Sequence, residues 1–201
     1  MSAPLRVVVI SDTHNQHDRF TLPEGDVLVH CGDFTAAGSD PELRDFDRWL
    51  AGLPFEHKLI VAGNHEYWMD GTGARIEALI RHGRVLMDEL VEIAGRRFYG
   101  MSWVSRGGGP SADRFDRIPA ELDMLLTHEP PFGVLDRTLQ DQHLGCPELL
   151  GAVQLLRPRR HAFGHIHENA GETEQDGTRF INACVVDELY RPAREAWLID
   201  V

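Results

Sequence analysis

Short apolar runs recur along this chain, and five of them end just before a cluster of polar side chains. Runs of this length, rich in Val, Ile and Leu, are typical of strands that are buried on both faces of a sheet. The predicted strands cover residues 5–10, 26–30, 58–62, 122–127, 179–186 and 196–201.

Helical patterns lie between some of these strands. Ser39 and Glu42 stand at the spacing of a capping box, and Pro41 suits a first helical position. The apolar stripe that follows consists of Leu43, Phe46, Trp49 and Leu50. Residues 73–82 and 147–156 are further helix candidates, and residues 91–103 are more typical of antiparallel hairpins. Helices that alternate with buried strands predict a layered α/β fold, here with mixed sheets.

The polar clusters that follow the strands contain side chains of the kinds that bind metals. Their members are Asp12, His14, Asp33, Asn64, His128, His165 and His167. Because ligands gather beyond the carboxyl ends of strands in α/β sheets, we expect these side chains to share one site. Glycine precedes three of them, at positions 32, 63 and 164, where it allows close approach. The i, i+2 spacing within two clusters predicts extended backbone with both side chains on one side.

The chemistry of this set favours transition metals. Two carboxylates, one amide and four imidazoles suit Mn, Fe, Zn or Co better than Ca, Mg or a structural zinc site. Seven side chains are too many for one ion of ordinary coordination, but they suit two ions that share a carboxylate. Two divalent ions beside two aspartates leave a net charge of about +2, which attracts a phosphate.

The chain resembles the calcineurin-like metallophosphoesterase superfamily in five blocks of sequence. These blocks are Asp12-x-His14, Gly32-Asp33, Gly63-Asn64-His65-Glu66, His128 and Gly164-His165-x-His167. Three longer motifs are similar to the compact metallophosphoesterase-domain-containing proteins and to class III cyclic-nucleotide phosphodiesterases, namely residues 32–35, 127–131 and 163–168. The resemblance implies a four-layer fold in which two mixed β-sheets are stacked and flanked by helices.

The resemblance also implies roles for single residues. The ligands of one metal ion would be Asp12, His14 and His167, those of the other Asn64, His128 and His165, and Asp33 would bridge the two. His65 would be the acid that protonates the leaving oxygen, and Asn64 and His65 would also contact the substrate. Arg106, in the glycine-rich segment 105–116, is a further candidate for substrate binding.

These roles predict a phosphoric ester hydrolase in which hydroxide formed on the metals attacks phosphorus. The favoured activity is hydrolysis of a small phosphodiester, with a cyclic nucleotide as one candidate substrate. Two alternatives are left open. One is a phosphomonoesterase or phosphoprotein phosphatase, and the other is a metal-containing binding protein without catalysis.

Length and charge limit the remaining possibilities. The 201 residues suit a single domain, and a net charge of −12 disfavours binding to a nucleic acid polymer, which usually needs a basic face. The first apolar stretch is too short for a membrane span, so no anchor is expected. Three widely separated cysteines predict reduced thiols and a cytoplasmic location. The oligomeric state is left between monomer and homodimer.

Overall fold

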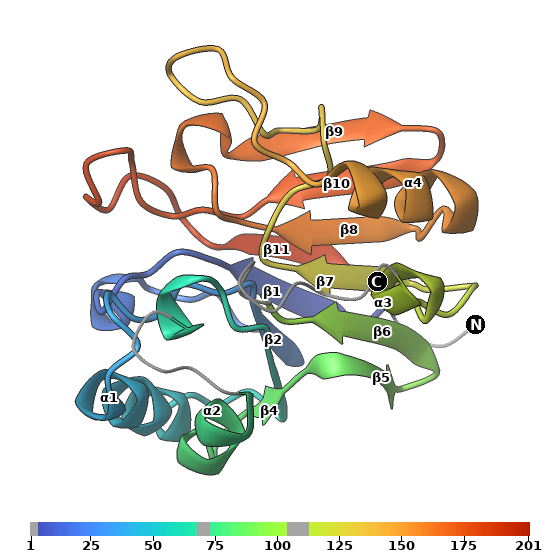
Figure 1. Ribbon diagram of the computed structural model, residues 1–201. Coiled ribbons are helices and arrows are strands. Elements are labelled where there is room, and N and C mark those ends of the chain that lie inside the picture. Colours follow the sequence, from blue (N-terminus) through green and yellow to red (C-terminus); the bar gives the residue numbers. More distant parts are fainter. Residues whose placement is uncertain (1–3, 68–72, 104–112) are drawn as a thin grey trace.

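Two stacked β-sheets form the centre of the protein, and the computed structural model describes residues 4–67, 73–103 and 113–201 (Figure 1). One sheet contains β1 (Arg6–Ile10), β2 (Val27–His30), β3 (His57–Ile60), β4 (Arg84–Val85) and β11 (Trp197–Asp200), in the order β11-β1-β2-β3-β4. The other contains β5 (Met87–Ile93), β6 (Arg96–Met101), β7 (Met124–Thr127), β8 (Arg160–Phe163), β9 (Gly171–Gln175) and β10 (Thr178–Asn182), in the order β5-β6-β7-β8-β10-β9.

Both sheets are mixed. In the five-stranded sheet, β1 to β4 are parallel and β11 is antiparallel to β1. In the six-stranded sheet, β6, β7, β8 and β10 are parallel, and the two edge strands β5 and β9 are antiparallel to their neighbours. Parallel neighbours end at the same edge of a sheet, so several loops of each sheet begin side by side.

Helices cover the outer face of each sheet (Figure 1). α1 (Asp40–Ala51) and α2 (Gly73–Leu79) pack on the five-stranded sheet, and α3 (Asp113–Asp116) and α4 (Pro147–Leu156) pack on the six-stranded sheet. At the start of α1 the Glu42 carboxylate accepts the backbone N–H of Ser39 at 2.8 Å, as the capping-box spacing predicts. The order helix, sheet, sheet, helix gives four layers.

Side-chain alternation divides the buried residues of each central strand between two cores. In β1, Val7 and Val9 face the core between the sheets, whereas Val8 and Ile10 face α1 and α2. In β8, Ala162 faces the other sheet and Phe163 faces α4. Burial of one such side chain as large as Val or Leu contributes about 1.5–3 kcal/mol. Burial on both faces explains why these strands are continuous apolar runs in the sequence.

The predicted fold class is confirmed, and several element boundaries differ from the prediction. α4 has the predicted bounds, but the helix predicted over residues 73–82 ends at Leu79, because the backbone N–H groups of Arg81 and His82 donate to the Asp47 carboxylate. The strand predicted over residues 179–186 ends at Asn182. The chain then bonds to Ser11 of the other sheet, which accepts the backbone N–H of Val185.

One strand gave no signal in the sequence. β9 reads Gly-Glu-Thr-Glu-Gln and lies at an exposed edge, so it has no apolar run and no apolar alternation to reveal it. The hairpins predicted over residues 91–103 are present as the antiparallel pair of β5 and β6, which starts earlier, at Met87. None of the helices in the described parts of the chain combines the length and apolar character that a membrane crossing needs.

Candidate metal centre

The seven side chains predicted as metal ligands lie just beyond the carboxyl ends of strands from both sheets. In chain order they follow β1 (Asp12, His14), β2 (Asp33), β3 (Asn64), β7 (His128) and β8 (His165, His167). The structure brings all seven together at the edge where the two sheets meet. Three groups of potential ligand atoms can be distinguished, each with its atoms within 4.8 Å of one another, and one of them shares members with the other two.

The first group consists of Asp12, His14 and His167. The Nε2 atoms of the two histidines lie 3.2 Å apart. The Asp12 carboxylate oxygen Oδ1 lies 3.3 Å from Nε2 of His167 and 3.9 Å from Nε2 of His14. One carboxylate and two imidazoles therefore face a common point, with further coordination positions left for solvent or substrate.

The second group consists of Asp33, His128 and His165. Asn64 belongs with it, because its Oδ1 lies 3.0 Å from Nε2 of His128, and that same nitrogen is 3.3 Å from Asp33 Oδ2. Asp33 also forms a group with His14 and His65, so its carboxylate lies between the two sets of ligands. This is the position that a bridging carboxylate occupies.

Four of these residues have left-handed backbone. Their φ angles are 60° for Asp12, 41° for His14, 52° for Asp33 and 72° for His165. The expectation of extended backbone at these i, i+2 pairs is therefore wrong, and the side chains converge through tight turns instead. A left-handed non-glycine residue costs about 1–3 kcal/mol and is found mainly where function requires the geometry.

Close packing requires glycine at all three predicted positions, and at Gly32 a Cβ atom would overlap Nδ1 of His128. A Cβ atom on Gly63 would overlap Oδ1 of Asp33, and one on Gly164 would overlap Oδ2 of Asp12. Any side chain at either position would displace a carboxylate that belongs to the candidate centre. The close approach predicted from the sequence is therefore confirmed at Gly32, Gly63 and Gly164.

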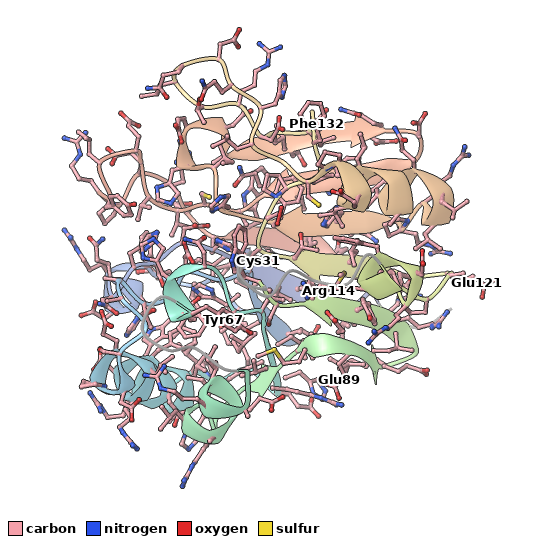
Figure 2. The ribbon with its side chains drawn as sticks, in the orientation of Figure 1. Cys31, Tyr67, Glu89, Arg114, Glu121 and Phe132 are labelled. Atoms are coloured by element: carbon pink, nitrogen blue, oxygen red, sulfur yellow. The ribbon has the colours of Figure 1, made fainter. Side chains whose placement is uncertain are left out.

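Backbone carbonyls fix the tautomer of three of the histidines. Nδ1 of His14 lies 3.2 Å from the carbonyl oxygen of Thr35. Nδ1 of His128 lies 2.8 Å from that of Cys31, which is labelled in Figure 2. Nδ1 of His167 lies 3.2 Å from that of Asp187. A carbonyl only accepts, so each Nδ1 carries a proton and Nε2 is the nitrogen that faces the site. The Nε2 atoms of His14 and His167 lie 3.2 Å apart, close enough to share either a proton or a metal ion. The donor set therefore fits divalent metal ions.

The electrostatics of the site lead to the same conclusion. Burial lowers the pKa of His14 and of His165 to about 4, so both rings are neutral at pH 7 and suited to bind a metal ion. Burial opposes ionisation of Asp12 and Asp33, but hydrogen bonds and charge from His167 and His128 hold both carboxyl pKa values below their usual range. Buried carboxylates that stay ionised need positive charge beside them, which bound divalent ions supply more strongly than protons.

The family assignment comes from a match that covers most of the chain. The family model for calcineurin-like phosphoesterases matches residues 5–169, a range that includes every residue of the candidate centre. The chain belongs to the calcineurin-like phosphoesterase family. Membership indicates a phosphoric ester hydrolase, and the family typically uses divalent metals, for which the ligand groups described above are candidates.

Curated relatives support the assignment to the calcineurin-like phosphoesterases. Metallophosphoesterase domain-containing protein 1 of Homo sapiens is 35% identical over 231 residues, which cover 98% of this chain and 71% of that protein. UPF0046 protein K07C11.7 of Caenorhabditis elegans is 38% identical over 201 residues, which cover 89% of this chain and 69% of that protein.

Solved structures show the same fold at low sequence identity. One crystal structure has a TM-score of 0.69 at 15% identity and covers 98% of this chain and 99% of its own. TT1561 of Thermus thermophilus has a TM-score of 0.59 at 14% identity, covering 90% of this chain and 89% of its own. These likenesses concern the arrangement of helices and strands only.

Glu66 has a place in this calcineurin-like phosphoesterase that sequence reasoning missed. Its fully buried carboxylate accepts the backbone N–H groups of Asp33 (2.9 Å), Thr35 (2.9 Å) and Gly63 (2.7 Å), and also the hydroxyl of Thr35 (2.7 Å). It thereby joins the loop after β2 to the loop after β3. Glu66 is the last residue of the block Gly63-Asn64-His65-Glu66. The spacing of such a block does not show that one of its side chains binds the backbone of another loop.

The open side of the centre is a pocket of about 280 Å³. Its lining includes Asp33, Asn64, His65, His165, His167, Glu168, Glu188 and Tyr190. Glu188 and Tyr190, which were not predicted, belong to the loop after β10, so the rule of strand ends would have found them. Arg106, predicted to bind substrate, lies outside the described residues.

Proposed function

We propose that this protein is a phosphodiesterase that uses two divalent metal ions to hydrolyse a small phosphodiester. The observation that carries the proposal is the shared carboxylate of Asp33, which lies within 4.8 Å of ligand atoms from both sets. Two sets of nitrogen and oxygen ligands joined by one carboxylate suit two ions better than one.

In this proposal Asp12, His14 and His167 hold one ion, Asn64, His128 and His165 hold the other, and Asp33 contacts both. Bound ions would lower the pKa of water and neutralise charge on the phosphate. The protein holds its ligands in a fixed geometry through the backbone carbonyls that accept from their Nδ1 atoms. It also keeps the centre largely buried, so charges act through a medium of low polarity.

In this proposal His65 transfers a proton. Its Nδ1 lies 2.6 Å from the carbonyl oxygen of Ala36, so Nδ1 carries a hydrogen and Nε2 is the nitrogen that exchanges one. Nε2 lies 3.7 Å from Asp33 Oδ2, and the side chain is 13% exposed at the edge of the pocket. In the protonated ring Nε2–H would donate to the departing oxygen, which leaves as an alcohol.

The charge of the pocket favours a diester over a monoester. Glu168 and Glu188 lie at its edge, and none of its described lining residues is Lys or Arg. A phosphomonoester carries a charge of about −1.5 to −2 at pH 7, by analogy with phosphorylated side chains. A diester carries only −1, because it has a single ionisable oxygen. Carboxylates at the edge therefore repel the monoester more strongly.

The test compares a chromogenic phosphodiester with its matching monoester, using chelated protein restored with Mn²⁺. We expect faster cleavage of the diester, loss of cleavage in Asp33→Ala, and retention in Asp18→Ala, which changes an exposed aspartate. That result would justify a screen of cyclic nucleotides. Preference for the monoester would replace the proposal with a phosphatase, and no turnover of either ester with metal bound would favour a binding protein.

A further inference from the structure

Tyr190 lies against the candidate metal centre with half of its surface open to solvent. Its ring centroid is 4.7 Å from that of His14 and 5.1 Å from that of His167, with interplanar angles of 79° and 88°. Tyr190 lines the pocket, yet the residue is 48% exposed. A large aromatic ring left half open beside a binding site offers contact area to a ligand.

The loop that carries Tyr190 is fixed at several points. The Asp187 carboxylate accepts the backbone N–H groups of Leu189 and Arg191, each at 2.9 Å, and also Nε of Arg191 at 2.9 Å. The backbone carbonyl of Asp187 accepts the N–H of Tyr190 at 2.9 Å. Nε2 of Gln16 donates to the carbonyl of Tyr190 at 2.8 Å, and Tyr190 has left-handed backbone with φ 58°. The ring is therefore presented by an ordered turn, which reduces the entropy lost on binding.

The charge beside this ring is negative. Glu188 and Glu168 line the same pocket as Tyr190. The nearby arginines are engaged elsewhere, since Arg191 pairs with Asp187 at 2.8 Å and Arg194 donates to the carbonyl of Val186 at 2.8 Å. An aromatic face with carboxylates beside it is suited to a cation, above all a quaternary ammonium group, which has no hydrogen-bond donors to satisfy.

We propose that Tyr190 and Glu188 form a cation subsite that selects phosphodiesters in which one alcohol carries an ammonium group on a short alkyl arm. This inference rests on the proposed function. The phosphate would lie at the metal centre, and the ammonium would lie against the exposed part of the Tyr190 side chain. Because that ring touches His14 and His167, the distance between phosphate and ammonium is short, as in esters of choline and related amino alcohols.

Two chromogenic diesters that differ by one atom test the inference. They are 4-nitrophenyl phosphorylcholine and 4-nitrophenyl 3,3-dimethylbutyl phosphate, in which carbon replaces the quaternary nitrogen. In both, hydrolysis adds water at phosphorus, breaks the P–O bond to the aryl group and releases 4-nitrophenol. The measured quantity is the ratio of kcat/KM for the choline ester to that for the neutral ester. We expect a ratio of about tenfold for the unaltered protein.

Variants assign that ratio to the subsite. Tyr190→Leu removes the ring and should reduce the ratio to about twofold, whereas Tyr190→Phe keeps the ring and should keep the ratio. Glu188→Gln should reduce the ratio of the two kcat/KM values by about threefold. Higher salt should also reduce this ratio in the unaltered protein. Leu189→Ala is the matched control, since Leu189 is on the same loop, is 61% exposed and is not a lining residue.

The outcomes separate this inference from the proposed function. Equal hydrolysis of both esters, or a ratio that survives in Tyr190→Leu, would overturn the cation subsite and leave the phosphodiesterase in place. Hydrolysis of neither ester by metal-restored protein would overturn the proposed function and the subsite with it. A ratio that falls equally in Leu189→Ala would show a general effect of the loop and would also overturn the assignment to Tyr190.

Discussion

At the scale of single residues, Glu66 shows how the candidate centre depends on a side chain that faces no substrate. Its carboxylate accepts four hydrogen bonds from two loops that carry candidate ligands. We expect Glu66→Gln to lower stability by about 2 kcal/mol, because the amide places a donor against a backbone N–H. Metal affinity should fall by about 10–100-fold, as for other partners that orient ligands. Calorimetric titration with Mn²⁺ and thermal unfolding measure both effects.

The control for Glu66→Gln is Glu121→Gln, which alters an exposed carboxylate far from the centre (labelled in Figure 2). It should leave both stability and metal affinity unchanged. Unchanged metal affinity in Glu66→Gln itself would show that the two loops keep their positions without this carboxylate.

His65 allows a sharp separation of proton transfer from metal binding. Its side chain lies within 4.8 Å of ligand atoms of His14 and Asp33, so it could act either as acid or as ligand. If it is the acid, His65→Ala should reduce turnover by about 10²–10⁴-fold and leave metal content unchanged. Metal analysis of the purified variant, beside its rate on the chromogenic diester, gives the answer. Parallel loss of metal and activity would make His65 a ligand instead.

At the scale of elements, Asp47 joins two helical segments. It lies on α1, and its carboxylate accepts the backbone N–H groups of Arg81 (2.6 Å) and His82 (2.8 Å) just after α2. Burial would raise its pKa, but these bonds and His82 lower it below the usual value. A lowered pKa in the folded state means that the stabilisation is complete above the unfolded pKa, and is lost as pH falls through the folded pKa.

We therefore expect Asp47→Ala to cost about 1 kcal/mol at pH 7, because two partly buried backbone N–H groups lose their acceptor. The cost should shrink below the usual aspartate pKa of about 3.9, because the protonated carboxyl of the unaltered protein accepts these bonds less well. Urea unfolding of Asp47→Ala and of the unaltered protein at pH 7 and pH 3 measures this cost as a difference in the free energy of unfolding. Asp18→Ala is the control. A cost that does not change with pH would mean that the charge of Asp47 contributes nothing.

The elements that the sequence predicted are those whose burial leaves a periodic pattern. The central strands have two buried faces, and the candidate ligands follow them directly, so the residues of the centre could be named from sequence. β9 is polar on both faces and gave no signal. The role of Glu66 was missed because it arises from contacts between loops distant in the chain, which spacing does not encode. The left-handed turns at Asp12 and His14 were missed because neither residue is glycine.

At the scale of the whole molecule, the candidate centre joins the two sheets. Each set of ligands contains residues from both sheets, since Asp12 follows β1 and His167 follows β8, while Asp33 follows β2 and His128 follows β7. Without cations the two sheets meet at this edge through buried carboxylates and imidazoles. A metal ion bound here would therefore link the layers, and its binding free energy would add to the stability of the sandwich.

This arrangement predicts that divalent metal raises the melting temperature. At a free Mn²⁺ concentration of about 100 times Kd the stabilisation is about 2.7 kcal/mol, which for a chain of this size corresponds to about 5–10 °C in Tm. Differential scanning calorimetry of chelated and Mn²⁺-restored protein measures the shift. In His167→Ala and in Asp33→Ala the shift should shrink. Asp33→Ala should lose more of the shift than His167→Ala. Asp33 lies near ligand atoms of both sets, whereas His167 belongs to one set only. If both variants keep the full shift in Tm of the unaltered protein, the stabilising ion binds elsewhere than between the sheets.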